Sequence, residues 1–255
     1  MAMDRLENLK NIIMYLMADN RVSHRIPSTL EERQRMMRAL MNVWEPRPIS
    51  EDFLKMQDAE LQMQCEDKGV VEISDITPQT SDILLWQGDI TRLKVDAIVN
   101  AANAQALGCW APLHNCIHSA AGIQLRKECN DTMQGRLLAT GNAFITKGYN
   151  LPAKHVIHTV GPIIPDGIPT KEQEEQLAAC YRSCLDLAEK NGLESIAFCC
   201  ISTGVFHFPN LRAAEIAIET VKSYPRHSLK TIVFNVFLDK DRDIYEQLLG
   251  ACPMA

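Results

Sequence analysis

Hydrophobic positions in the first part of the chain recur at helical spacing. One stripe consists of Leu6, Leu9, Ile12, Ile13 and Leu16, at intervals of one, three or four residues. The capping-box pattern Ser28-Thr-Leu-Glu31 predicts a second helix that runs to about Val43 and ends before Pro46. Ser50 is expected to begin a third helix. Residues 1–68 are therefore predicted to form a helical extension packed on the main domain.

From Val70 onward, short apolar runs alternate with amphipathic stretches. Strands are predicted at 70–73, 83–87, 97–101, 142–146, 155–160, 195–200 and 231–237. Helices are predicted at 118–129, 171–191, 211–223 and 239–249. Strands that alternate with helices need crossover connections, which give a parallel or mixed sheet covered on both faces. Residues 69–255 are thus predicted to form a three-layer α/β/α domain around a mixed central sheet.

Composition narrows the range of partners. The 255 residues carry a formal net charge of -6, so the chain is not expected to bind nucleic acid through its phosphate backbone. A nucleotide-sized phosphate ligand remains open, because backbone N–H groups can bind one. No apolar run approaches the ~20 residues that span a bilayer, and no membrane partner is expected. The nine cysteines are interpreted as thiols or metal ligands and not as a disulfide framework, which favours a cytoplasmic protein. The chain is expected to be a monomer.

A loop rich in metal-ligand residues follows the third predicted strand. Within eight positions it carries Cys109, His114 and Cys116. Two thiols and one imidazole on a short tether suit Zn²⁺, and a catalytic zinc keeps three protein ligands with a fourth position open. A structural zinc would need a fourth protein donor, for which His118 or a distant cysteine is available. Otherwise His118 and His158 are interpreted as structural histidines.

Three loops leave the carboxyl ends of the predicted parallel strands, where ligands bind in open α/β sheets. They follow Asn100, Cys200 and Val236. The second contains Ser202-Thr-Gly204 ahead of a helix. Two hydroxyls and a permissive backbone at a helix N-terminus suit a phosphate group. Ser-Thr-Gly alone is weak evidence, because turns of that composition are common.

Taken together, these stretches resemble the macrodomain family, an α/β fold that binds ADP-ribose. The matching segments are Gly88-Asp-Ile90, Val95–Asn103, Ala120-Ala-Gly122, Thr140-Gly141, Val156–Gly161 and Ile201–Phe206. The cysteine–histidine loop and the helical extension resemble the zinc-dependent branch, whose members act as protein mono-ADP-ribosyl hydrolases. That branch often accompanies a sirtuin-like ADP-ribosyltransferase and a lipoylated carrier protein.

The resemblance implies roles for individual residues. Asp89 would accept a hydrogen bond from the adenine amino group, with the Ile90 backbone beside it, because an ionised carboxylate is only an acceptor. Asn103 would contact the distal ribose, and Asn235 would border the adenine or the ribose. Backbone N–H groups would hold the diphosphate at Ser202, Thr203, Gly204, Val205 and Phe206. Asn100 is instead expected to tie its loop to the sheet.

The resemblance also implies a reaction, hydrolysis at the anomeric carbon of ADP-ribose or of an ester to it. The catalytic residues would be Asn103, Cys109, His114 and Cys116, with Zn²⁺ polarising a ribose hydroxyl or a water. The chain departs from the branch after Cys116, which runs straight into Ile117-His118 without the acidic residue commonly found there. The alternative is therefore a catalytically weak ADP-ribose reader in which zinc shapes the loop.

Overall fold

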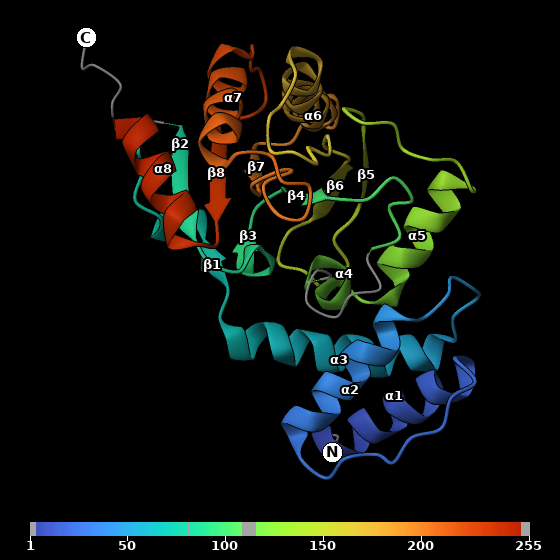
Figure 1. The fold of residues 1–255 in the computed structure, drawn as a ribbon. Helices are drawn as coiled ribbons and strands as arrows, with labels where there is room; N and C mark the ends of the chain where they lie inside the picture. The colour runs from blue at the N-terminus through green and yellow to red at the C-terminus, as the bar shows by residue number, and fades with distance from the viewer. Residues whose placement is uncertain (1–3, 81, 109–115, 251–255) are drawn as a thin grey trace.

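A six-stranded sheet forms the centre of the molecule, with helices on both of its faces (Figure 1). The computed structural model describes residues 4–80, 82–108 and 116–250. The strands are β2 (Ile83–Gln87), β4 (Ala97–Ala101), β5 (Ala143–Lys147), β6 (His155–Thr159), β7 (Ser195–Phe198) and β8 (Thr231–Val236). Their order is β2-β8-β7-β4-β6-β5, and every neighbouring pair is parallel except β5 and β6. The predicted α/β fold with a mixed central sheet is confirmed.

Successive residues of each strand point to opposite helical layers. In β4, Ala97 and Val99 belong to the core under α6 (Lys171–Lys190), α7 (Asn210–Ser223) and α8 (Asp239–Gly250). Ile98 lies in the core on the other face, under α4 (Cys116–Ala121) and α5 (Ile123–Met133). Because both faces are buried, the strand consists mainly of apolar residues instead of alternating polar and apolar ones.

Two features of this region differ from the sequence prediction. The helix predicted over 118–129 is in fact two helices, α4 and α5, separated by Gly122, whose φ of +104° interrupts the helical backbone. The segment predicted as a strand at 70–73 contains only β1 (Val71–Glu72), followed by the 3₁₀ turn η1 (Ile73–Asp75). β1 pairs with β3 (Leu93–Lys94), which is too short to give a periodic signal in the sequence.

The first three helices form a unit of their own beside the sheet domain, here called the N-terminal helical unit. It comprises α1 (Arg5–Asp19), α2 (Leu30–Asn42) and α3 (Glu51–Lys68). Its core contains Leu9, Ile12, Ile13, Leu16, Met37, Phe53 and Leu61, together with Ile123 of α5. The predicted capping residue was wrong by one position, because Thr29 and not Ser28 accepts the hydrogen bond from the Glu32 N–H.

Among the described helices, none is long and apolar enough to cross a membrane.

The middle of α3 is fixed to the sheet domain by buried hydrogen bonds. Gln57, which is 0% exposed, accepts through Oε1 from the backbone N–H of Ile123 at 3.0 Å. The neighbouring Asp58 Oδ1 accepts from Gln124 at 2.8 Å and from Asn150 at 2.6 Å. These contacts set the position of α3 along its length, so its last turn lies against the 3₁₀ turn η2 (Ile90–Arg92) that follows β2.

Candidate active site

A cavity of about 440 Å³ lies at the carboxyl ends of β4, β6 and β7. Four segments line it, namely the residues after β4, the residues after β6, the loop after β7 and the first turn of α4. Its walls include Asn103, Gly161, Ser202, Phe206 and Cys116. Because parallel strands end at the same edge of a sheet, groups that are distant in sequence meet there. The loops predicted after Asn100 and Cys200 are thus brought together with Cys116, whereas no described residue of the loop predicted after Val236 lines this cavity.

The loop after β7 leaves several of its backbone donors free. Its carbonyl groups are used: Ser202 O accepts from Phe208 N at 3.0 Å, and Phe206 O accepts from Ile164 N at 2.7 Å. The N–H groups of residues 204–206, by contrast, have no backbone acceptor within the described part of the chain. Gly204 and Val205 are exposed and Phe206 is half-buried, so these donors are open to a ligand. A run of such donors beside a cavity is suited to an anionic ligand such as a diphosphate.

Close packing between two strand ends determines the shape of this loop. Ser202 is 6% exposed and has a φ of +65°, a conformation that costs energy for a residue with a side chain. Gly161, after β6, faces it so closely that a Cβ atom at this position would lie 2.0 Å from Ser202 Oγ. Gly161 therefore allows the Ser202 loop to approach the end of β6.

Two asparagines near the end of β4 have different surroundings. The Asn100 amide lies 3.1 Å from Nδ1 of His158 on β6, so Asn100 links β4 to the neighbouring strand, whereas the sequence predicted a link between its loop and the sheet. Asn103 donates through Nδ2 to Gly108 O at 3.2 Å. Its Oδ1 is buried and has no hydrogen-bond partner among the described residues, although Asn103 lines the cavity. An acceptor in that position is suited to a ligand hydroxyl.

The predicted metal loop can be followed only at its end. Cys109 and His114 lie outside the described residues. Cys116 begins α4, is exposed, and lines the 440 Å³ cavity that Asn103 also lines. The thiol of Cys116, a soft type of metal ligand, therefore lies at this cavity.

A second group of metal-ligand types includes His118, which lines the same cavity. The group consists of three buried residues, His118, Cys129 and His158. Each offers one possible ligand atom, and these three atoms lie within 4.8 Å of one another. Burial lowers the pKa of His118 to about 3 and raises that of the Cys129 thiol to about 12. These groups are thus neutral at physiological pH. His158 Nε2 lies 2.9 Å from Thr146 Oγ1, which fits the predicted structural role. His118 lacks such contacts: neither of its ring nitrogens has a partner in the described chain.

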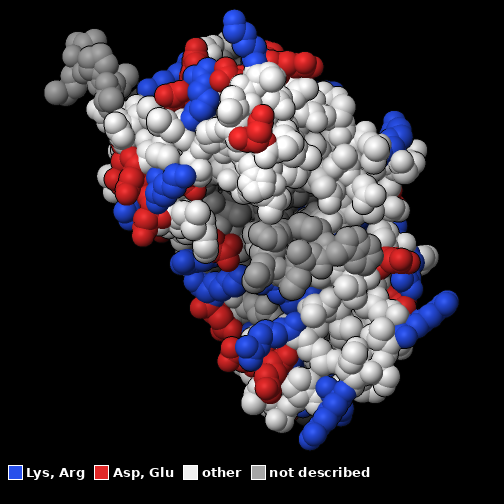
Figure 2. All heavy atoms as spheres, in the orientation of Figure 1, with Lys and Arg blue, Asp and Glu red and all other residues white. Residues whose placement is uncertain are grey.

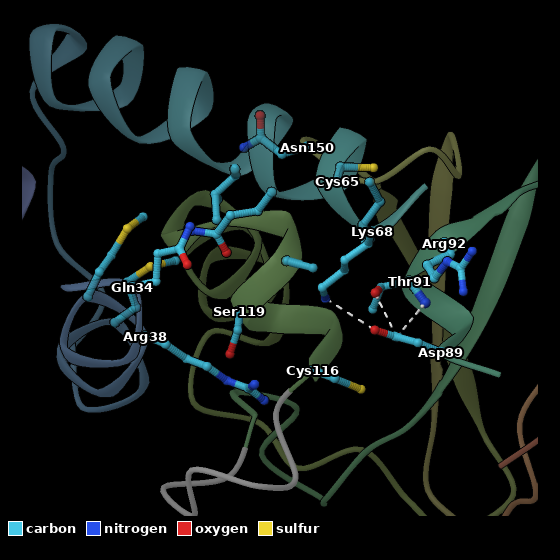
Figure 3. A pocket seen from close by; sticks show the side chains of 16 residues that line it. Gln34, Arg38, Cys65, Lys68, Asp89, Thr91, Arg92, Cys116, Ser119 and Asn150 are labelled. Carbon is cyan, nitrogen blue, oxygen red and sulfur yellow. Dashed lines mark hydrogen bonds and ion pairs between the residues drawn. The ribbon is translucent and has the colours of Figure 1, made fainter. Parts of the chain in front are cut away.

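Asp89 stands at the start of η2, between the N-terminal helical unit and the sheet domain (Figure 3). Its Oδ1 accepts from Thr91 N at 3.0 Å and from Thr91 Oγ1 at 2.7 Å, and its Oδ2 lies 3.1 Å from Lys68 Nζ. Burial raises the pKa of Asp89, but the Thr91 hydrogen bonds and the Lys68 ammonium outweigh that effect and lower it. The carboxylate is therefore ionised at neutral pH. The following Ile90 is buried.

Asn235 stabilises the turn that carries Asp89 through hydrogen bonds to the backbone. Its side chain is 6% exposed, and its Nδ2 donates to Gly88 O at 3.0 Å and to Trp86 O at 3.3 Å. The amide thus holds the end of β2 where the chain turns toward Asp89. Phe237, the residue that follows β8, is 72% exposed and therefore does not pack in the core.

Sequence reasoning missed the contribution of the N-terminal helical unit. A second cavity, of about 90 Å³, is lined by Arg38 of α2 and by Cys65 and Lys68 of α3, facing Asp89 and Cys116 (Figure 3). Cys116 lines both cavities. A lysine in the last turn of a helix is a common surface feature, and only its position 21 residues ahead of Asp89 was visible in the sequence.

Charge on this face of the molecule is mixed. Figure 2 shows lysines and arginines interspersed with acidic residues, mainly along one side and over the N-terminal helical unit. Uncharged residues cover much of the upper half of the view. Among the described residues that line the small cavity, Arg38, Lys68 and Arg92 are basic and Asp89 is acidic.

Comparison with known proteins gives concordant matches. The family model described as "Macro domain" matches residues 99–217. A "Protein-ADP-ribose hydrolase" of Treponema medium is 48% identical over 94% of this chain and 97% of its own length. A protein with the same description from Staphylococcus aureus (strain MRSA252) is 45% identical over 96% of this chain and 97% of its own length. The crystal structure of the Trypanosoma brucei macrodomain in complex with ADP-ribose superposes with a TM-score of 0.65 and 32% identity, covering 84% of this chain and 95% of the other.

Proposed function

The chain belongs to the Macro domain family, and from this premise we propose that it is a zinc-dependent protein mono-ADP-ribosyl hydrolase. It would remove ADP-ribose from modified protein side chains and release the unmodified side chain. The substrate class is supported by two relatives described as protein-ADP-ribose hydrolases that align over nearly their whole length. Zinc dependence rests on the residues of this chain alone.

One observation carries the proposal. In a single cavity, backbone donors of residues 204–206 that have no backbone acceptor lie with the Asn103 amide and the Cys116 thiol. These are the groups needed to hold a diphosphate, a ribose hydroxyl and a metal ion, in that order. The thiol lies at the cavity wall with Asn103, so a metal ion bound there would be next to the ribose, where it can act on the scissile bond; this position favours an enzyme.

Each part of ADP-ribose has a proposed partner in this arrangement. The adenine amino group donates to Asp89, beside the Ile90 backbone. The diphosphate accepts from the N–H groups of Ser202, Thr203, Gly204, Val205 and Phe206. The distal ribose donates a hydroxyl proton to Asn103 Oδ1, which orients the anomeric carbon toward the open side of the cavity. Asn235 acts indirectly, because it fixes the turn that carries Asp89.

Cys109, His114 and Cys116 would hold the zinc. The fit is supported by the donor set, two sulfurs and an imidazole, and by the exposure of Cys116 at the cavity. When bound, the ion supplies Lewis-acid polarisation of a water or of a ribose hydroxyl. Asn103 and the Ser202–Phe206 loop would hold the sugar, so the contribution of the protein itself would be to orient the scissile bond.

The modified protein is proposed on the resemblance alone, as a lipoylated carrier protein. The alternative function is an ADP-ribose reader that turns its ligand over slowly. It is favoured by the sequence after Cys116, where Ile117-His118 follows without an acidic residue that could serve as a general base.

An assay with two arms separates the enzyme from the reader. Purified protein is incubated with a mono-ADP-ribosylated carrier protein, with and without a strong chelator, and released ADP-ribose is measured by mass spectrometry. We expect release in the untreated arm, loss of release with chelator, and recovery when zinc is added back. Binding of free ADP-ribose without release in either arm would overturn the hydrolase and leave the reader.

A further inference from the structure

Asp89 has a limited number of hydrogen-bond positions, and most are already used. An ionised carboxylate offers about four acceptor positions, two on each oxygen. Thr91 fills both positions on Oδ1 through its N–H and its hydroxyl, and Lys68 takes one on Oδ2. Among the described residues, no other donor reaches Asp89. One acceptor position therefore remains, on the oxygen that Lys68 holds.

The end of α3 is attached to the Asp89 turn at two points. Besides the Lys68–Asp89 ion pair at 3.1 Å, Arg92 Nε donates to Gly69 O at 2.7 Å. Gly69 ends α3 with a φ of +77°, which directs its carbonyl toward Arg92. The middle of the helix is anchored to the sheet domain through buried Gln57. Lys68 therefore approaches Asp89 from a fixed backbone.

We propose that Lys68 of the N-terminal helical unit is a positioning residue for base recognition, because it holds Asp89 with its one remaining acceptor position turned to the ligand. The inference rests on the proposed binding of ADP-ribose. Through Lys68, the N-terminal helical unit would contribute to nucleotide binding. Without Lys68, only the Thr91 contacts hold the planar carboxylate, so the whole group has more freedom to rotate about the Cα–Cβ and Cβ–Cγ bonds, and Oδ2 moves with it.

The consequence is selectivity for the base. The adenine amino group is a donor and fits the remaining acceptor position, whereas hypoxanthine places a carbonyl oxygen there and meets the carboxylate with like polarity. A fixed Oδ2 makes this difference large, and a mobile one can turn away from the carbonyl. Lys68 therefore affects the preference between the two bases more than it affects binding of the shared ribose-diphosphate part.

The test compares ADP-ribose with inosine diphosphate ribose, which carries hypoxanthine in place of adenine. Affinities are measured by calorimetry for the full-length wild type, Lys68→Met, Lys68→Arg and the control Lys94→Met. Lys94 forms a similar ion pair with Glu72, at 2.8 Å, on the neighbouring β3. For Lys68→Met we expect ADP-ribose to bind about three- to tenfold more weakly, the range for one hydrogen bond. The analogue should change less than about twofold.

Rescue and coupling distinguish positioning from a general structural effect. Lys68→Arg should restore most of the adenine preference, and Lys94→Met should leave both affinities as in the wild type. In an Asp89→Ala background, Lys68→Met should have no further effect on ADP-ribose binding, because the two residues act as one unit. An unchanged adenine preference in Lys68→Met, or an equal loss for both ligands, would overturn the proposal.

The same measurements distinguish this inference from the proposed hydrolase. A wild type that binds ADP-ribose but does not hydrolyse a modified protein would overturn the hydrolase, and the adenine preference of the Lys68 variants would still decide the inference. A wild type that does not bind ADP-ribose would overturn both.

Discussion

Single polar side chains around the cavity are best understood by asking which of their atoms already have partners. The Asn100 amide contacts His158, and the Asn235 amide donates to the backbone of β2 and its turn. Asn103, in contrast, keeps Oδ1 without a described partner at the cavity wall. Leaving a buried acceptor unpaired costs about 1–3 kcal/mol. A ligand hydroxyl that donates to Asn103 Oδ1 would remove that cost, which supports the proposed role of this asparagine.

The buried histidines predict how stability depends on pH. Burial lowers the pKa of His158 well below its ordinary value of 6.5. The folded pKa is thus below the unfolded one, so the stabilisation is fully present above pH 6.5 and is lost as the pH falls. Between pH 6.5 and 4.5 we expect His158→Gln to lose less stability than the wild type, by about 1.4 kcal/mol per pH unit.

Urea denaturation at each pH measures this difference. The comparison uses the slope of the unfolding free energy against pH, which is independent of the absolute stability of the variant. Depressed carboxyl groups such as Asp89 and Asp96 titrate below their ordinary value of 3.8 and do not interfere in this window. Equal slopes for the two proteins would show that His158 is not held neutral in the fold.

At the scale of elements, sequence patterns predicted the long helices and strands correctly and the short or interrupted ones poorly. The runs at 83–87 and 97–101 coincide with β2 and β4, because strands buried on both faces carry continuous apolar residues. The break at Gly122 was missed, since a single glycine inside a helical pattern is often tolerated. Lys68 was missed for another reason: its contact with Asp89 depends on how α3 packs, which local patterns do not encode.

At the candidate site, too, some residues could be predicted from the sequence and others could not. Asn103, Cys116 and the Ser202 loop could be predicted to meet, because carboxyl ends of parallel strands share one edge of the sheet. The surroundings of Asn235 could not, because the direction of a side chain at a strand end depends on the neighbouring turn. Its amide donates to Gly88 O and lines neither cavity.

The contact between Gly161 and the Ser202 loop predicts a localised effect of one methyl group. Gly161→Ala would place Cβ 2.0 Å from Ser202 Oγ and 2.9 Å from Ile201 Cγ2. Displacing the loop should lower the unfolding free energy by about 1–3 kcal/mol and weaken ADP-ribose binding. Thermal unfolding and calorimetry measure the two effects.

Gly204→Ala is the matched control in the same loop, because a Cβ there meets nothing within 4 Å. Its melting temperature should equal that of the wild type. If Gly161→Ala were as stable as Gly204→Ala and bound ADP-ribose equally well, close packing at Gly161 would not shape the loop.

At the scale of the whole molecule, the N-terminal helical unit and the sheet domain share a core and buried hydrogen bonds. Ile123 of α5 packs among the residues of α1, α2 and α3. Arg126 of the same helix donates to the carbonyls of Asn42 and Trp44 at 2.8 and 2.7 Å. Contacts of this kind couple the folding of the two parts, so we expect them to unfold in a single transition.

Gln57→Ala tests this coupling. The substitution leaves the buried N–H of Ile123 without its acceptor, which should cost about 1–3 kcal/mol. The control is Gln62→Ala, an exposed position on the same helix, which should unfold like the wild type. Denaturant unfolding followed by tryptophan fluorescence and by circular dichroism should give coincident curves for all three proteins. Separate transitions in the wild type would contradict the coupling.

The account depends on a metal-dependent reaction in the cavity that Cys116 lines, and one measurement addresses it directly. Wild type and Cys116→Ala are purified without added zinc, and zinc content, circular dichroism and ADP-ribose release from a mono-ADP-ribosylated protein are determined on the same samples. We predict about one zinc per chain and release for the wild type. Cys116→Ala should keep the fold but lose both. Release at the wild-type rate by Cys116→Ala, or from a wild type that contains no zinc, would contradict the account.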